Sequence, residues 1–533
     1  MKNKTAVFFI VFFCTTFIYS QTISLKSIPN YKKWGWNAIV MQNDFITIAT
    51  VPAIGGRVMQ YDLGNLPSVY IDSSLFGKTY TPAQNELHIF GGYKTWPSPQ
   101  NNWSAAGWPP PPTLDYGLYT VTDTVRSNDS VCVVVESPVE KWLAPGIKFI
   151  RKATMYAGTS RVRMEGTIIN QGTQPANWGM WGITQSIVNH PGKTDYQNYW
   201  AYFPLNPNST YGKSGVSPSG ASKAWKGEIL PGIYGVQFSP DNQKVFADPV
   251  RGWIAYAVLS DTVVFVKTFN ISEGAQYPDN GARVTVYVSD KSALYMEVET
   301  KGPVANLPAN GGMYTFTENW WSAKVRAPLL VVNSAGAIAK KLSYNSTTKN
   351  ISGIYGIFYD GTAKVVVKNA AGQILAEGHQ YNVSPLKEIK LDETMNFPVN
   401  SKTVEVLVQN KNGSLIGVLD AAEVSQLLTS VETTNSLIPS EFRLEQNYPN
   451  PFNPSTVIRY SIPASPDPSE GEMLVSLKIY DVLGRQVAAL INEQKSPGFY
   501  EVKFDGTGLS SGVYFYRLQS GSFSEAKKFM LMK

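Results

Sequence analysis

The chain is 533 residues long, enough for about three or four domains of ordinary size. Hydrophobic residues make up 43% of it and charged residues only 16%, below the ~25% typical of soluble domains. The net charge of +6 is spread thinly, with no run of five like charges. This composition favours β-rich domains and excludes the electrostatic footprint of a protein that binds nucleic acid or a membrane surface.

Residues 1–20 are predicted to be a signal peptide. Lys2 and Lys4 supply the positive start, and the apolar stretch Ala6–Ile18 is too short to span a bilayer. A lipoprotein cysteine at Cys14 is the alternative, but bulky residues precede it where small ones are required. No later segment approaches ~18 consecutive apolar residues, so no transmembrane segment is expected after signal removal.

Nearly every later segment has the pattern of a β-strand: short β-branched or aromatic runs between Gly, Pro, Asn and Asp. The clearest runs are Phe45–Val51, Arg161–Asn170, Trp253–Leu259, Thr262–Phe269 and Arg283–Val288. Long helical periodicity is absent, so the predicted class is all-β. Cys132, in the strand-like SVCVVVE, is expected to be a core residue without a disulfide partner.

Tryptophan divides the chain. All thirteen tryptophans lie between Trp34 and Trp321, so residues 21–326 are predicted to form a functional head. Residues 327–424 predict an immunoglobulin-like β-sandwich, with hairpin turns at Asn369–Gly372 and Asn410–Gly413. The Ser/Thr/Glu-rich residues 425–441 predict a linker, and residues 442–533 a last domain.

The last domain opens with QNYPNPFNPSTVIRYSIP (Gln446–Pro463) and continues with VSLKIYDVLGRQVAAL (Val475–Leu490). It ends with LSSGVYFYRL (Leu509–Leu518) and the basic strand KKFMLMK (Lys527–Lys533). In this order the segments closely resemble the type A C-terminal sorting domain of the type IX secretion system. The resemblance implies a small β-sandwich, contact with the type IX machinery, and a secreted or outer-surface protein from which the domain is usually removed.

One motif in this domain imitates a catalytic one. Residues Gly508–Gly512 match the Gly-x-Ser-x-Gly nucleophile elbow, which requires a turn from a strand into a helix. Here the motif leads into the strand-like GVYFYRL. We therefore predict a turn of the sorting domain.

Four segments of the head carry a second resemblance: Asn37–Gly64, the Pro/Trp-rich Gly91–Gly117, Ile168–Gln185 and Tyr295–Trp321. Together they resemble an uncharacterised family in the galactose-mutarotase-like superfamily. The resemblance implies a β-supersandwich, two large antiparallel sheets face to face. We expect sugar to bind on a concave face of this supersandwich. The same fold serves epimerases, lyases, hydrolase domains and passive binders, so it leaves the activity open.

Residues suited to sugar binding are concentrated in Gly91–Gly117, which we interpret as a long loop. Sugars have apolar C–H faces ringed by hydroxyls, so their sites combine flat aromatic rings with polar groups. An alternative is that these tryptophans cap the open edge of the sandwich. The predicted substrate-binding residues are Lys94, Trp96, Trp103, Trp108, Asp115, Trp181 and Gln185.

The candidate catalytic residues are Glu297, His190 and His88. Mutarotase chemistry needs a general base and a general acid, and in the resembled enzymes a glutamate and histidines take these roles. Glu297 and Glu299 alternate with apolar residues and so point to one sheet face. His190 lies beyond the segment where the resemblance places the catalytic histidine. The alternatives are a solvated sheet face for the glutamates and ordinary loop positions for the histidines.

No Cys/His cluster has metal-ligand spacing, so no metal or cofactor is predicted. A calcium site built from carbonyl oxygens and aspartates has no sequence signature, so the sequence neither predicts nor excludes calcium.

We expect a secreted carbohydrate-active or carbohydrate-binding protein. An enzyme of this kind would be epimerase-like, a lyase or glycoside-hydrolase-like. The alternative is a structural or adhesive surface protein whose head binds no small ligand.

Overall fold

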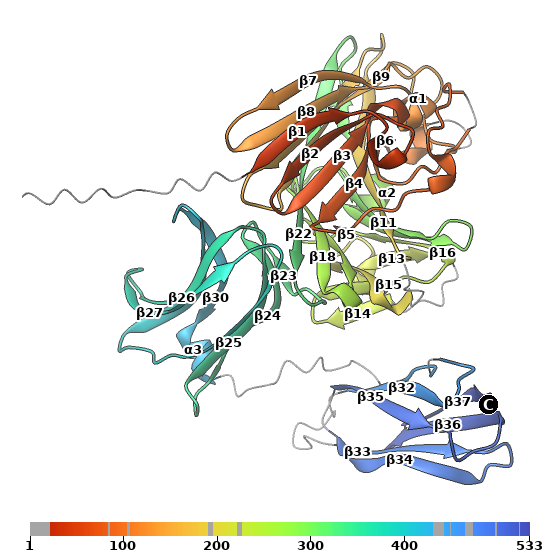
Figure 1. Ribbon diagram of the computed structural model, residues 1–533, viewed down its shortest axis with the longest axis vertical. Helices are drawn as coiled ribbons and strands as arrows, with labels where there is room; N and C mark the ends of the chain where they lie inside the picture. The colour runs from red at the N-terminus through yellow and green to blue at the C-terminus, as the bar shows by residue number, and fades with distance from the viewer. Residues whose placement is uncertain are drawn as a thin grey trace, which may run out of the picture.

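The computed structural model describes residues 22–83, 86–103, 107–189, 196–220, 226–429, 442–447, 449–463, 473–495, 498–521 and 523–532. The predicted signal peptide and His190 lie outside these described residues. Within them, no helix has the length and apolar character needed to cross a membrane. Regular structure is almost entirely β, which confirms the predicted all-β class (Figure 1). The α-helices are short: α1 (Pro112–Tyr116), α2 (Pro278–Gly281) and α3 (Val424–Thr429).

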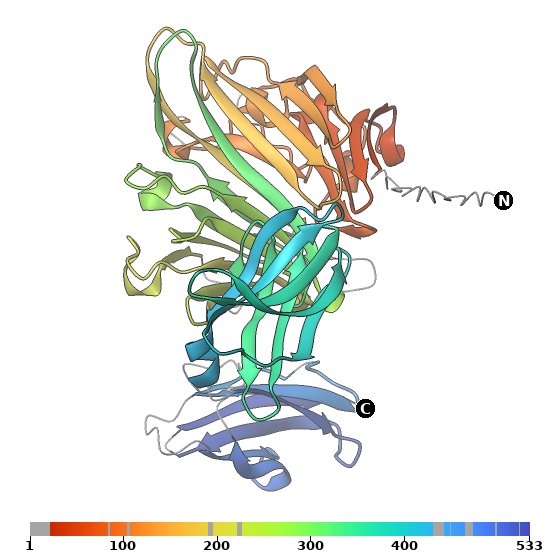
Figure 2. The ribbon, with the colours of Figure 1, turned by 90° about the vertical axis from the view of Figure 1, so that its left-hand side faces the viewer.

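Two large antiparallel sheets form the head (Figures 1 and 2). The twelve-stranded sheet has the order β1-β2-β3-β4-β6-β11-β20-β19-β16-β13, with β5 paired to β4 and β21 to β11. Its strands are β1 (Ile23–Ile28), β2 (Ala38–Asn43), β3 (Ile46–Val51), β4 (Arg57–Leu63), β5 (Leu66–Pro67), β6 (Tyr93–Ser98), β11 (Ala176–Ile187), β13 (Val216–Ser219), β16 (Asp241–Ala247), β19 (Val284–Asp290), β20 (Tyr295–Lys301) and β21 (Ala305–Leu307).

The ten-stranded sheet has the order β14-β15-β12-β17-β18-β22-β10-β9-β8-β7. Its strands are β7 (Thr120–Arg126), β8 (Ser130–Glu136), β9 (Ile147–Tyr156), β10 (Val162–Asn170), β12 (Tyr199–Pro204), β14 (Lys226–Leu230), β15 (Ile233–Gln237), β17 (Trp253–Val258), β18 (Val263–Phe269) and β22 (Gly312–Lys324). All five clearest strand predictions are confirmed, and Cys132 is buried as expected.

One apolar core fills the space between these two sheets. In β20, Met296 and Val298 enter this core, whereas Glu297 and Glu299 point to the opposite face. Tyr61 of the twelve-stranded sheet packs against Phe265 and Trp320 of the ten-stranded one. The alternation of side chains therefore gives the twelve-stranded sheet an inner apolar face and an outer face rich in polar groups.

The middle sandwich has its own apolar core between two four-stranded sheets. Their strands are β23 (Val331–Val332), β24 (Gly336–Asn345), β25 (Asn350–Ile357) and β28 (Glu388–Thr394) in one sheet, and β26 (Gly361–Asn369), β27 (Ile374–Val383), β29 (Ser401–Asn410) and β30 (Leu415–Glu423) in the other. The turns at Asn369–Gly372 and Asn410–Gly413 join β26 to β27 and β29 to β30, as predicted. Helix α3 buries Leu427 in this core, so residues 425–429 of the predicted linker pack with the sandwich.

The C-terminal residues form a third, smaller sandwich with a separate core. Its strands are β31 (Arg443–Leu444), β32 (Ser455–Ile462) and β35 (Gly498–Asp505) in one sheet, and β33 (Met473–Tyr480), β34 (Gln486–Lys495), β36 (Gly512–Ser520) and β37 (Phe523–Leu531) in the other. Gly508–Gly512 leads into strand β36, so the serine motif is a turn in a β-sandwich and not a nucleophile elbow.

The interpretation of Gly91–Gly117 as one long loop was wrong. Tyr93–Ser98 is strand β6, paired along its length with β11, and Pro112–Tyr116 is helix α1. Pro97 and Pro99 argued against a strand because proline cannot donate to a sheet ladder. Strand β6 tolerates Pro97 because its other edge pairs with β4 only at Tyr93, which leaves the remaining edge without a ladder to disrupt.

A fully buried ion pair joins the two sheets of the head. The Nζ atom of Lys267 on β18 lies 3.2 Å from Glu318 on β22 and donates to the carbonyl oxygen of Gly182 on β11, at 3.1 Å. Glu318 also accepts hydrogen bonds from Thr300 and from the indole of Trp320. Removing one partner of such a pair leaves the other charge buried without compensation.

We expect Lys267→Met to lower the free energy of unfolding by about 3–5 kcal/mol, measured by urea denaturation. The double variant Lys267→Met/Glu318→Gln should recover part of this loss, because no charge then remains unpaired. A loss below about 1 kcal/mol in the single variant would show that the pair does not constrain the fold.

Candidate functional site

A row of four side chains crosses the outer face of the twelve-stranded sheet. The strand register places Gln185 of β11 opposite Glu297 of β20, and Glu297 opposite Tyr287 of β19. Tyr287 in turn lies opposite Lys244 of β16. Residues in register on neighbouring strands share one face of the sheet. Two of the predicted site residues, Gln185 and Glu297, are therefore direct neighbours.

Two further rows lie beside this one. Lys94 of β6, Ile183, Glu299 and Thr285 follow one another across four strands. Trp96, Trp181 and Lys301 form the next row. The register thus gathers predicted residues from positions 94 to 297 on one face.

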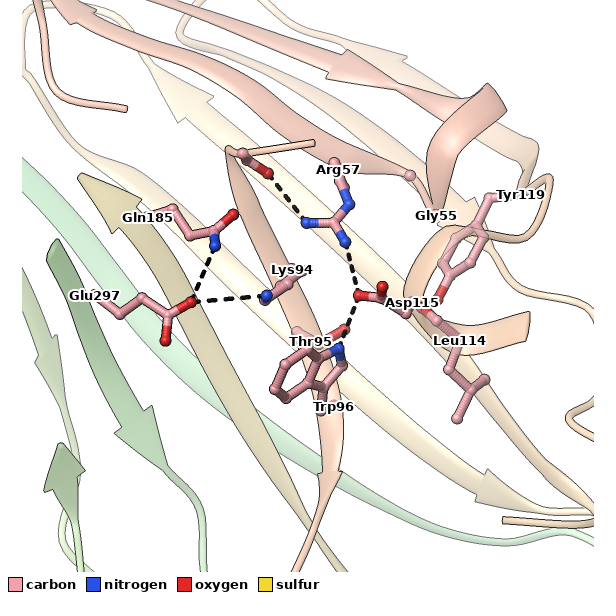
Figure 3. A network of polar contacts seen from close by, with 12 residues as sticks. Gly55, Arg57, Lys94, Thr95, Trp96, Leu114, Asp115, Tyr119, Gln185 and Glu297 are labelled. Carbon is pink, nitrogen blue, oxygen red and sulfur yellow. Dashed lines mark hydrogen bonds and ion pairs between the residues drawn. The ribbon is translucent and has the colours of Figure 1, made fainter. Parts of the chain in front are cut away.

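The predicted residues Lys94, Gln185 and Glu297 form one group of polar contacts (Figure 3). The Oε1 atom of Glu297 accepts a hydrogen bond from Nε2 of Gln185 at 3.1 Å and lies 3.7 Å from Nζ of Lys94. The ammonium group of Lys94 also lies 4.1 Å from the centre of the Trp96 ring. Lys94 is thus held between a carboxylate and an indole, a favourable setting for a partly desolvated cation.

Asp115 anchors the other side of this group. Its Oδ1 atom accepts hydrogen bonds from Nη2 of Arg57, at 2.7 Å, and from the indole nitrogen of Trp96, at 2.8 Å (Figure 3). Helix α1 carries Asp115 against the Gly55–Gly56 turn, where a Cβ on Gly55 would lie 2.1 Å from the backbone oxygen of Asp115. Only glycine permits this approach. Asp115 therefore orients Trp96 and is itself held by Arg57.

The predicted tryptophans Trp96, Trp103, Trp108 and Trp181 contact one another. Trp96 packs edge-on against the other three at 5.3–6.1 Å, and Trp103 stacks on Trp181 at 6.2 Å. Trp96, Trp103 and Trp181 are buried, whereas Trp108 is 46% exposed. The cluster therefore forms a rigid aromatic wall, and Trp108 is the member of it with a face accessible to a ligand.

Burial changes the proton affinity of the central pair. It raises the pKa of Glu297 to about 7, an effect that the Lys94 charge opposes and the neighbouring Glu299 reinforces. Burial also lowers the pKa of Lys94, against the opposing effect of Glu297. A carboxyl group that titrates near neutral pH can give or accept a proton under physiological conditions.

Several buried polar atoms on this face have no hydrogen-bond partner among the described residues, and three of them lie in the two rows that contain Glu297 and Glu299. These three are Oε1 of Gln185, Oε1 of Glu299 and Oγ1 of Thr285. Buried polar atoms in proteins are nearly always hydrogen-bonded, if not to protein then to water or a ligand. The outer face therefore holds unused hydrogen-bonding capacity next to Glu297.

The candidate histidines are not part of this group. The ring of His88 stacks on Tyr80 at 3.6 Å and lies 3.4 Å from Glu86, so its contacts run to a separate aromatic cluster beside Tyr116. His190 lies outside the described residues. The described part of the chain thus brings no histidine to Glu297.

The prediction from sequence missed several charged and aromatic residues of this face. Lys244 lies 3.6 Å from Glu299, and Trp181 donates to Glu299 at 2.8 Å. Lys301 pairs with Asp279 and lies 4.4 Å from the Trp181 ring centre. The alternation in DNQKVFA and RVTVYV could have indicated Lys244 and Tyr287, but only strand order shows that these strands neighbour β20.

Two open hollows lie elsewhere. One, of about 780 Å³, lies between β1, β2 and the β7–β8 turn, and one of about 360 Å³ lies on the middle sandwich around Asp360 and Lys411. Neither is lined by an aromatic side chain, so neither offers the flat surface that suits a sugar ring. Among the described residues, no group of three or more His, Cys, Asp or Glu side chains is arranged to hold a metal ion.

Comparison with known proteins gives a family for the end of the chain. Residues 446–532 match the family of secretion system C-terminal sorting domains. This confirms the resemblance of the last domain, and the protein is exported by type IX secretion to the cell surface or the medium. No curated protein sequence matches the chain.

Solved structures are similar to the N-terminal part. A protein of Synechocystis shares 12% identity over 54% of this chain and 96% of its own, with a TM-score of 0.38. A galactose mutarotase-like protein of Clostridium acetobutylicum shares 10% sequence identity over 57% of this chain and 99% of its own, with a TM-score of 0.36. A galactose mutarotase-like protein of Lactobacillus casei shares 12% identity over 54% of this chain and 99% of its own, also with a TM-score of 0.36. At this similarity no residue role passes from those proteins to this chain.

The raised pKa of Glu297 predicts a pH dependence of stability. Between its ordinary value of 4.5 and about 7, the folded state holds a proton that the unfolded state releases. The free energy of unfolding should therefore fall as pH rises through this window, by up to about 3 kcal/mol. Urea denaturation at pH 5 and pH 8 should show this fall in the wild type and a smaller one in Glu297→Gln. In the control variant Glu377→Gln, on the middle sandwich, an unchanged fall is expected.

Deletion of residues 446–532 should abolish export. In a bacterium with a type IX system, the truncated chain should accumulate in the periplasm while the full-length chain reaches the surface or medium, as followed by immunoblotting of cell fractions. Equal export of both forms would contradict the assignment of the sorting signal to this domain.

Proposed function

We propose that the head is a carbohydrate-active module that binds a saccharide on the outer face of its twelve-stranded sheet. The observation that carries this proposal is Glu297: a buried carboxyl group with a pKa of about 7, beside the ammonium of Lys94 and the amide of Gln185. Aromatic side chains surround this polar group on the same face. Such a combination suits a ligand that is apolar on its ring faces and polar at its rim.

In this proposal Glu297 is the group that transfers a proton. Epimerisation, elimination and glycoside hydrolysis each require a proton to move at a sugar carbon or oxygen, and a carboxyl group is most effective when its pKa lies near the working pH. Lys94, 3.7 Å away, would stabilise the ionised form of Glu297 and hydrogen-bond a sugar oxygen. Its single ammonium lacks the two-pronged geometry of an arginine.

The unpartnered atoms supply the proposed polar contacts to the saccharide. Oε1 of Gln185 and Oγ1 of Thr285 lie on either side of the glutamates in the sheet register. Hydroxyl groups of a sugar can donate to the first and exchange hydrogen bonds with the second. The accessible face of Trp108 and the half-buried ring of Tyr287 would contact the C–H faces of the sugar.

A head that only binds saccharide is the second candidate. It is favoured because the titratable groups beside Glu297, Lys94 and Glu299, each already have an opposite charge as neighbour, and an acid–base reaction at a sugar commonly uses two titratable groups. The aromatic wall of tryptophans and the row of polar side chains from Gln185 to Lys244 would then act as a recognition surface. A purely structural or adhesive head without a small ligand remains the alternative class.

We further propose the division of the chain at the predicted boundaries: a head at 21–326, a spacer sandwich at 327–424 and a sorting domain at 442–533. Each of the three parts has an apolar core of its own, which supports this division. The spacer is more than a tether, because Trp321 of the head stacks on Phe358 of the sandwich at 4.9 Å. Arg326 also pairs with Glu388 across the same junction, at 2.7 Å.

Titration of the secreted protein with a panel of glycans should reveal a ligand that changes its tryptophan fluorescence. With a glycan that is turned over, Glu297→Gln should lower kcat by about 10²–10⁴-fold, the usual contribution of a general acid or base. Glu165→Gln, on the partly accessible face of the ten-stranded sheet, should keep full activity.

Three results would separate the candidates. Binding without turnover that survives Glu297→Gln would favour the recognition module. Full turnover in Glu297→Gln would remove the proposed role of this carboxyl group. No response to any glycan would favour the adhesive class.

A further inference from the structure

Lys244 differs from the other basic residues of the outer face. Its side chain is 22% exposed, compared with 5% for Lys94 and none for Lys301. Its Nζ atom lies 3.6 Å from Oε1 of Glu299, a distance too long for a direct hydrogen bond. This Nζ donates no hydrogen bond to another described residue. An ammonium group has three donors. Lys244 is therefore a cation with unused donors at the accessible side of the site.

Aromatic rings hold this cation in place. Nζ lies 4.5 Å from the ring centre of Trp181 and 5.5 Å from that of Phe246. Contacts of this kind favour the charged ammonium and limit its movement. The position of the Lys244 charge is thus defined by the same aromatic wall of tryptophans that holds Lys94.

The accessible cation lies on the same row as the proposed proton-transfer group. Lys244, Tyr287 and Glu297 stand in register on three neighbouring strands. The Lys244 side chain reaches across β19, so that its Nζ atom lies 3.6 Å from Glu299, which is two residues from Glu297 on the same face of β20. A saccharide ring in contact with Tyr287 would present one edge to Glu297 and a substituent on the same side to Lys244.

The charges of this face balance in pairs. Arg57 pairs with Asp115 and Lys301 with Asp279, which leaves Lys94 and Lys244 facing Glu297 and Glu299. Protonation of Glu297, which burial favours by raising its pKa, removes one negative charge from this group. An anionic ligand would restore the balance.

We infer that the saccharide is acidic and carries a carboxylate or sulfate group, which Lys244 binds at the accessible end of the row. This inference rests on the function proposed above and specifies its substrate class. Lys244 acts as a specificity residue and takes no part in proton transfer. A neutral sugar oxygen can also accept from this ammonium, but a carboxylate or sulfate oxygen accepts a charge-assisted hydrogen bond, which is roughly twice as strong as one between neutral groups.

The test compares the binding of three probes to the full-length protein by calorimetry. The probes are an oligogalacturonate, a sulfated oligosaccharide without carboxylates and an uncharged galacto-oligosaccharide. At least one acidic probe should bind tenfold or more tightly than the uncharged one, with an affinity that falls as salt is raised. Lys244→Gln should remove this tenfold preference, so that the acidic and uncharged probes bind the variant with similar affinity. The two acidic probes distinguish a carboxylate from a sulfate ligand.

Two control variants complete the design. Lys244→Arg keeps the charge and should keep the preference. Lys152→Gln removes a lysine of the ten-stranded sheet whose Nζ atom lies at a similar distance from a glutamate, 3.7 Å from Glu165, and should have no effect. If Lys244→Gln fails to fold, the wild-type comparison between acidic and uncharged probes still decides the question.

The outcomes separate the two proposals. Equal affinity for acidic and uncharged probes, or a preference that survives in folded Lys244→Gln, would overturn this inference and leave the proposed function intact. Failure of every saccharide to bind would overturn the proposed function, and this inference with it.

Discussion

The need to pair buried charges is the constraint on which the proposed site depends. Four basic side chains on the outer face of the twelve-stranded sheet, each with an acidic partner, make up the charged centre of the proposed site. An ionised group away from water costs several kcal/mol unless an opposite charge or hydrogen bonds compensate it. Each basic side chain accordingly has an acidic neighbour from another strand or helix: Arg57 with Asp115, Lys94 with Glu297, Lys244 with Glu299, and Lys301 with Asp279.

The paired carboxyl groups have different roles on this face. Asp115 accepts from both Arg57 and Trp96 and acts as a structural anchor, because its contacts are short and fully buried. The contacts of Glu297 to Lys94 and Gln185 are longer, and burial keeps its pKa near neutral. Of these two carboxyl groups, the one with the longer contacts is thus the one suited to chemistry. Structural and chemical roles lie next to each other because the same burial that rigidifies the indoles also perturbs the carboxyl group.

Recognition from sequence worked best where the chain order itself carries the information. The sorting domain has its motifs in a fixed order near the end of the chain, and its family match covers nearly all of the predicted range. Strand β6 shows the opposite case: its prolines indicated a loop, and only the knowledge that most of one edge has no neighbour explains why a strand forms. Lys244 was missed for a related reason. A single lysine in a short alternating run does not indicate a binding site until the neighbouring strand is known.

The sequence by itself determined the all-β class, the position of most strands in the head, the hairpins of the middle sandwich and the sorting domain. These follow from local alternation, turn residues and motif order. It also singled out Lys94, Trp96, Asp115, Trp181, Gln185 and Glu297 as residue types suited to a sugar site. Only the tertiary structure decided that they share one face, that His88 does not join them and that Lys244 does. Strand order in a twelve-stranded sheet joins residues up to two hundred positions apart, and no local pattern encodes which strands become neighbours.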